Sequence, residues 1–228
     1  MKGLTKLLVT MALTIGPMAC VLPLDVVAEN EEDARVTGSG HVVTRSWTVE
    51  DFDAVRALGI GRVIITKTGR ESLTVTGEDN ILSRLEIEVR DGVLHVGPRA
   101  GANLKPTRDL LFRLEAKELG LIEGSGAVSF DADLGRAEAL FVRLSGASNL
   151  EATGEVRALD VRTSGASWFF GRDLTSRSAD VSTSGATAVV VNAAERLRAT
   201  ASGVSSIRYV GSPALHSTVS GLASVCQY

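Results

Sequence analysis

The sequence predicts an all-β protein, built as a right-handed parallel β-helix (a solenoid) with irregular N-terminal coils and a hairpin. Three observations lead to this prediction. A Ser-Gly dipeptide recurs at steps of 20, 19, 20, 18 and 18 residues, apolar and polar residues alternate ahead of it, and aromatic residues make up only 4% of the chain. About 20 residues at roughly 3.3 Å each make one coil of short strands and corners. Stacking such coils places equivalent residues about 4.8 Å apart, in columns.

Each Ser-Gly dipeptide is predicted to form a corner of a coil. Gly tolerates the positive φ that a tight corner needs, and Ser can hydrogen-bond the local backbone. An apolar residue stands five positions after each Ser. The period-2 alternation before the dipeptide is typical of a half-buried strand. The predicted corners are Ser125, Gly126, Ser145, Gly146, Ser164, Gly165, Ser184, Gly185, Ser202, Gly203, Ser220 and Gly221.

The first residues indicate export. Residues 1–28 combine a basic start, a short apolar run and a small-residue site that ends at Ala28, which predicts a cleaved secretory signal peptide. The alternative is a lipoprotein signal that anchors the chain at Cys20. We therefore expect a protein of the periplasm or the bacterial cell surface, with no transmembrane helix after signal cleavage.

The remainder is predicted to be one stacked domain behind a short tail. Residues 29–37 are acidic at their start and are predicted to be mobile. Asp91-Gly92 lies between two apolar stretches and predicts a hairpin. The stacked domain is expected over 38–228, with divergent coils over 38–119 and regular Ser-Gly rungs over 120–228.

Composition argues against several classes of function. The net charge of −3 argues against a nucleic-acid binder, which would show a basic excess. Two Cys and three scattered His offer no metal site or disulfide scaffold. The chain has no phosphate-binding loop and no nucleophile elbow, so we expect no cofactor and no catalytic residue.

Several stretches of the chain resemble one known family. The resemblance covers about residue 38 to the end of the chain. The sequence is similar to the autotransporter adhesin, head GIN domain family of bacterial secreted proteins. This resemblance implies a β-helical protein of the cell envelope and transfers no catalytic residues. In this chain Ser148, Ser167 and Thr187 stand where the family often has an acidic residue or Asn after the corner. The stretches that carry the resemblance are 38–45, 52–55, 69–75, 77–82, 89–94, the Ser-Gly-Ala rungs and 209–215.

Two carboxylates fall at equivalent places on successive rungs. Asp160 and Asp180 would share an outward column, and paired carboxylates can hydrolyse glycosides or bind calcium. The simpler interpretation is a solvated charge ladder in which Arg198 and a diagonal Arg162 offset the acidic pair.

Two arginines also stack on successive rungs. Arg143 and Arg162 could hold an anionic sugar or a phosphate. The alternative is that these arginines pair in water with Glu123 and Asp160.

One aromatic cluster stands out at residues 168–170. Because Phe169 takes an inward position, Trp168 and Phe170 should point outward. Such a pair could stack on a sugar ring or form an interface. Equally, Phe170 could cover its neighbour Val190 while Trp168 shields the edge of a coil.

These observations favour an exported envelope protein with an adhesion, binding or structural role and no catalysis. The expected partner is an envelope polysaccharide, an envelope protein, or a second copy of the chain that pairs through an open end of the helix. The alternative function is a polysaccharide lyase or hydrolase that uses the Asp160/Asp180 ladder.

Overall fold

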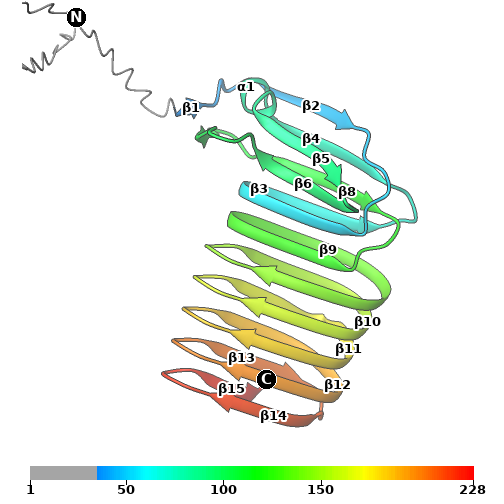
Figure 1. Ribbon diagram of the computed structural model, residues 1–228, viewed down its shortest axis with the longest axis vertical. Helices are drawn as coiled ribbons and strands as arrows, with labels where there is room; N and C mark the ends of the chain where they lie inside the picture. The colour runs from blue at the N-terminus through cyan, green and yellow to red at the C-terminus, as the bar shows by residue number, and fades with distance from the viewer. Residues whose placement is uncertain (1–34) are drawn as a thin grey trace, which may run out of the picture. The chain divides into compact units, whose positions relative to one another are not determined.

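The computed structural model describes residues 35–228, which form an all-β structure with a single short helix among them (Figure 1). The predicted signal peptide, the alternative anchor Cys20 and residues 29–34 of the acidic tail lie outside the described residues. The all-β prediction is confirmed. The elements are β1 (Val36–Thr37), β2 (Val42–Trp47), β3 (Ala54–Lys67), β4 (Ser72–Glu78), α1 (Asp79–Leu82), β5 (Leu85–Arg90), β6 (Val93–Pro98), β7 (Leu104–Lys105), β8 (Leu111–Ala116), β9 (Leu121–Leu144), β10 (Asn149–Thr163), β11 (Trp168–Thr183), β12 (Ala188–Ala201), β13 (Ser206–Val210), β14 (Ala214–Val219) and β15 (Ser224–Gln227).

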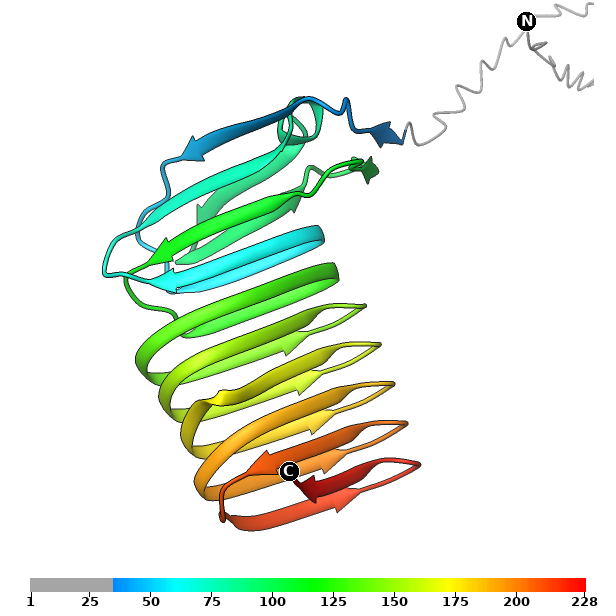
Figure 2. The same ribbon diagram turned by 180° about the vertical axis from the view of Figure 1, so that it is seen from behind.

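Strands β9 to β15 pair in parallel with their neighbours, in the register that the sequence indicates. Leu150 pairs with Phe130 in the preceding strand and with Phe169 in the next. Strands β9 to β12 each run along one side of the stack, bend, and return along the other side (Figures 1 and 2). We call the chain from one Ser-Gly turn to the next a level. Stacked levels explain why equivalent residues about 20 positions apart lie side by side.

The N-terminal part departs from this pattern, so the sheet as a whole is mixed. Strand β3 pairs in parallel with β9, β8 and β6, but β4 runs antiparallel to both β8 and β2. The predicted hairpin is confirmed, since β5 and β6 are antiparallel around Asp91 and Gly92, which have φ of 51° and 75°. The expectation of divergent coils did not include antiparallel strands. Period-2 alternation specifies which face of a strand is buried and carries no information about strand direction.

The N-terminal boundary also differs from the prediction. Residues 36–37 fall in the predicted mobile tail, but they form the short parallel pair β1–β7 with residues 104–105, in which Val36 lies opposite Leu104. Both side chains pack against the buried core, and this small apolar contact explains why the segment is held.

The interior is filled mainly by aliphatic side chains in columns. Leu140, Leu159 and Leu197 are at most 2% exposed and lie one above another, with the smaller Ala179 between the last two. Each fully buried leucine contributes on the order of 1.5–3 kcal/mol relative to an exposed one. Because a single level cannot enclose its own apolar face, the levels stabilise one another.

The Ser-Gly turns stack through their backbones. Gly146, Gly165 and Gly185 have φ of 72°, 74° and 86°, a region that favours glycine. In each turn the residue after the glycine donates its N–H to the glycine carbonyl of the previous level; Ala166 N to Gly146 O is 2.7 Å. A Cβ added at Gly165 would lie 2.6 Å from that same carbonyl oxygen. The turns therefore need glycine for conformation and for space.

We predict that Gly165→Ala lowers the free energy of unfolding by about 3 kcal/mol or more, because it combines left-handed strain with overpacking against the neighbouring turn. Gly69→Ala is the matched control. Gly69 has φ of +80°, but nothing lies within 4 Å of an added Cβ, so its loss should be only about 1–2 kcal/mol. Urea denaturation of both variants tests this difference. Equal losses would show that close approach of the turns does not matter.

Candidate binding surfaces

Outward side chains form two faces on the stack of levels. Strand residues that follow a Ser-Gly turn lie on one side of the buried interior, and strand residues that precede the next turn lie on the other (Figures 1 and 2). We call the first the aromatic face and the second the charged face. The aromatic face includes Asn149, Glu151, Trp168, Phe170, Ala188, Val190, Ser206 and Arg208; the charged face includes Phe141, Arg143, Asp160, Arg162, Asp180 and Arg198.

The aromatic face carries two neighbouring exposed rings. Trp168 is 50% exposed and Phe170 is 44% exposed, whereas Phe169 between them is fully buried. The outward orientation that the sequence indicated for both side chains is therefore correct. Trp168 and Phe170 are two positions apart, so strand alternation places both rings on the same outward face of β11.

Phe170 has a packing role as well. Its register neighbour Val190 is only 8% exposed, although Val190 lies on the outer face between two inward valines. Val190 has Phe170 on one side and Arg208 on the other, and these large side chains account for its burial. Both interpretations of the pair thus have a basis, because Phe170 covers Val190 and still exposes much of its ring.

Polar side chains border the exposed rings. Asn149 is the register neighbour of Trp168, and Glu151 is the neighbour of Phe170. Glu151 lies next to Asp131, which accepts a 2.7 Å ion-pair contact from Arg62. A flat apolar pair with hydrogen-bonding groups beside it suits a ligand that has both an apolar face and hydroxyl groups.

The charged face contains the predicted carboxylates. Asp160 and Asp180 are register partners, as expected from their spacing. Asp160 accepts from Arg162 at 3.1 Å, and Arg198 is the register neighbour of Asp180. A groove runs across these levels, and its lining includes Phe141, Asp160, Asp180, Arg196 and Arg198. The acidic pair thus lies among cations, which is the arrangement of a charge ladder.

Arg143 lies beside Glu123 and Arg162, which line the same groove, but the predicted ion pair with Glu123 is not formed. Arg143 and Arg162 are register partners, but Glu123 pairs with Arg56 at 2.9 Å, because Arg56 lies opposite it on β3. Arg162 does pair with Asp160, as the sequence suggested. The six predicted binding residues consequently divide between two faces and do not form one site. Among residues 35–228 there is no cluster of three or more His, Cys, Asp or Glu that could hold a metal ion.

The residues that follow the turns serve the turns themselves. Ser148, Ser167 and Thr187 are at most 4% exposed and point into the interior. Ser148 Oγ donates to Ser145 O at 2.9 Å, and Ser167 Oγ donates to Ser164 O at 2.8 Å. The two serine hydroxyls satisfy turn carbonyls. Thr187 Oγ1 is buried without a hydrogen-bond partner among the described residues, so none of the three hydroxyls faces an external ligand.

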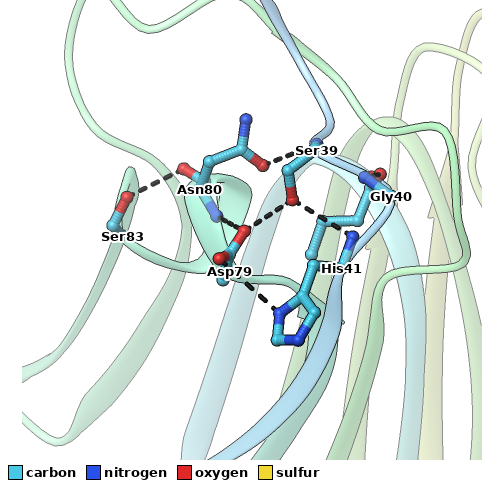
Figure 3. Close-up of polar contacts among 7 residues, drawn as sticks. Ser39, Gly40, His41, Asp79, Asn80 and Ser83 are labelled. Carbon is cyan, nitrogen blue, oxygen red and sulfur yellow. Dashed lines mark hydrogen bonds and ion pairs between the residues drawn. The ribbon is translucent and has the colours of Figure 1, made fainter.

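A polar cluster near α1 was not foreseen from the sequence. Ser39 Oγ donates to Asp79 Oδ1 at 2.5 Å, and His41 Nδ1 lies 3.7 Å from Asp79 Oδ2 (Figure 3). The Ser39 hydroxyl holds the pKa of Asp79 below its usual range. Because the serine hydroxyl donates to the carboxylate and not to the imidazole, the histidine does not activate it as a nucleophile.

The buried carboxylate of Glu78 lies beneath this cluster and accepts hydrogen bonds from two other segments of the chain. It is 1% exposed, and its carboxylate accepts from Gly40 N at 2.6 Å, Thr107 Oγ1 at 2.5 Å and Thr107 N at 2.8 Å. These donors, with the Thr107 hydroxyl foremost, hold the pKa of Glu78 below its usual range. Glu78 therefore ties the segment before β2 and the loop before β8 to the end of β4.

Comparison with known proteins assigns the family. Residues 51–213 match the family described as "Putative auto-transporter adhesin, head GIN domain". The chain belongs to the head GIN domain family. Membership in an adhesin family indicates an exported or surface protein, and no helix in the described residues is long and apolar enough to span a membrane.

Solved structures share the fold of this GIN domain at low sequence identity. A "putative adhesin" from Bacteroides fragilis is 19% identical with a TM-score of 0.66, and 85% of this chain covers 100% of that one. A "putative lipid binding protein" from Parabacteroides distasonis is 19% identical with a TM-score of 0.59, with coverage of 85% and 99%. A "putative adhesin" from Parabacteroides merdae is 19% identical with a TM-score of 0.55, again at 85% and 99%. No curated protein sequence matches the chain.

We predict that Glu78 makes the GIN domain sensitive to acid. Its pKa is lowered in the folded state, so its contribution is present above the unfolded value of about 4.3 and is lost as pH falls through the folded pKa. Glu78→Gln should therefore reduce stability at neutral pH and flatten the acid side of the stability profile. Urea unfolding from neutral pH to about pH 3 measures both effects.

Two further variants test whether the acid transition depends on the hydrogen bonds to the Glu78 carboxylate. Thr107→Val removes the main donor and should raise the pKa of Glu78, which moves the acid transition to higher pH. Ser83→Ala removes a hydroxyl of the same region that donates to Asn80 O, and it should leave the profile unchanged. A Glu78→Gln profile parallel to that of the parent would contradict this role.

Proposed function

We propose that this protein is an exported, non-catalytic binding protein of the bacterial cell envelope that attaches to an envelope polysaccharide through its aromatic face. The exposed pair Trp168 and Phe170 carries the proposal. Sugar rings present flat C–H surfaces to aromatic rings and hydroxyl groups to polar neighbours, and the aromatic face provides both. Membership in a family described as adhesins supports a role in attachment.

We propose also that the stacked levels form a right-handed parallel β-helix and that the mature protein begins after Ala28. Two observations support the β-helix: residues one level apart in the sequence pair in parallel strands, and the glycine turns stack on one another. A rigid stack suits attachment, because it holds Trp168 and Phe170 in place without a cost in loop ordering when a ligand binds.

A lipid ligand is the competing proposal. It is favoured by the description of the P. distasonis structure as a lipid-binding protein. The two rings would then enter the apolar part of a lipid and not stack on a sugar. The carboxylates of the charged face support neither ligand, since Asp160 is already paired with Arg162.

We predict that Trp168→Ala and Phe170→Ala each weaken polysaccharide binding roughly tenfold or more, since aromatic anchors dominate such contacts. Phe141→Ala is the matched control. Phe141 is 48% exposed, close to the 44% of Phe170, but it lies on the charged face, so binding should be unchanged. The measurement is retention of the purified protein on peptidoglycan, lipopolysaccharide and capsular polysaccharide, read alongside thermal unfolding of each variant.

Other outcomes would replace the proposal. Equal retention of the parent and Trp168→Ala proteins would remove the aromatic face as the site. Binding to phosphatidylglycerol vesicles that depends on Trp168, without polysaccharide retention, would establish the lipid ligand. Release of reducing sugar from any of the polysaccharides would contradict the non-catalytic role, and Asp160→Asn would then test the carboxylate pair.

A further inference from the structure

The C-terminal end of the stack leaves two strand edges open. Strand β14 pairs only with β12 and β15 pairs only with β13, so one edge of each has no partner among the described residues. Figure 2 shows these two strands as the last level, with nothing beneath them. An open edge presents unpaired N–H and C=O groups that another strand can use.

The same end exposes side chains that other levels bury. Leu215 is 42% exposed and Val219 is 46% exposed, whereas their register partners Leu197 and Ala201 are each 1% exposed. At the tip of the turn, Leu222 is 82% exposed. The last level therefore presents an apolar interior and an apolar tip that a further layer would cover.

Charge distinguishes this end from the opposite one. From Tyr209 to Tyr228 the sequence has no Asp, Glu, Lys or Arg. At the other end, edge strand β2 carries the exposed Arg45 between Val43 and Trp47, which pack on the core. A charge on the inner side of an edge strand blocks the pairing of edges. The C-terminal edge has no such block.

We propose that this edge is a dimer interface, at which a second copy of this chain pairs end to end through β14 and β15. A two-fold axis brings the same patch of both copies together, so an edge with side chains of one charge sign would repel its copy; β14 and β15 contain no Asp, Glu, Lys or Arg. A two-fold axis across the stack either reverses each strand or exchanges the two sides of the stack, whose strands run in opposite directions (Figures 1 and 2). The joint is therefore antiparallel, and Leu215 and Val219 of both copies close over each other.

The geometry also limits assembly to two copies. A filament would need the C-terminal edge to pair with the opposite end, where β2 is antiparallel to β4 and Arg45 lies on its inner side. Joining like ends consumes both C-terminal edges. The edge strands of the large sheet that remain are β2, with its inward Arg45, and β5, which carries Glu86, Glu88 and Arg90. This inference is independent of the polysaccharide proposal, since it involves neither outward face.

The test is the mass of the purified chain in solution, measured by light scattering after size exclusion over a series of concentrations. We expect a dimer at micromolar concentration. Leu215→Lys should weaken self-association at least roughly 100-fold, because it would bury two unpaired ammonium groups in the joint. Leu215→Met should keep the dimer.

Thr200→Lys is the matched control, because Thr200 is exposed on the outside of β12, one level above β14. It should keep the dimer, and thermal unfolding should show that all variants fold. Hydrogen exchange provides a second measurement, with β14 and β15 amides slowing as the parent dimer forms. A parent protein that stays monomeric with fast-exchanging edges, a dimer that persists in Leu215→Lys, or growth into filaments would each overturn the proposal.

Discussion

The structure depends on the close approach of successive turns. The glycine carbonyl of one turn accepts the N–H of the next, as in Ala186 N to Gly165 O at 2.8 Å. This contact sets the spacing between levels at one edge of the stack, and a Cβ at the glycine would occupy the space of the carbonyl. Columns of leucine and valine can pack behind the turns only because the spacing is constant from level to level.

The scarcity of aromatic residues follows from that constant spacing. A ring in the narrow interior needs a neighbour without a side chain: a Cβ at Gly124 would lie 2.6 Å from the Phe130 ring, and one at Gly171 would lie 2.6 Å from the Phe169 ring. Most levels fill the same column with Leu150, Val189 and similar side chains, which need no such gap. Trp168 and Phe170 avoid this constraint because they point outward.

Sequence alone predicted what repeats locally and missed what depends on distant contacts. The turns, the buried columns and the outward direction of Trp168 and Phe170 follow from the step between Ser-Gly dipeptides and from period-2 alternation. The antiparallel pairing of β4 with β2 and β8 does not, because alternation is the same for either strand direction. Glu78 was missed for a similar reason: its donors Gly40 and Thr107 lie 38 and 29 residues away. The inward Ser148 shows that position in a motif does not fix the direction of a side chain beyond a turn.

The two proposed surfaces, the aromatic face and the edge of β14 and β15, lie at different places on the same stack. The aromatic face lies along the side of the levels, and β14 and β15 lie at their end, so occupation of one leaves the other accessible. A two-fold joint at the end would give each dimer two aromatic faces on one rigid body. Two weak sites held together bind a repetitive polymer far more tightly than either alone, because the second binding event is intramolecular. A modest pair of rings such as Trp168 and Phe170 is then sufficient for firm attachment, without a deep pocket on either face.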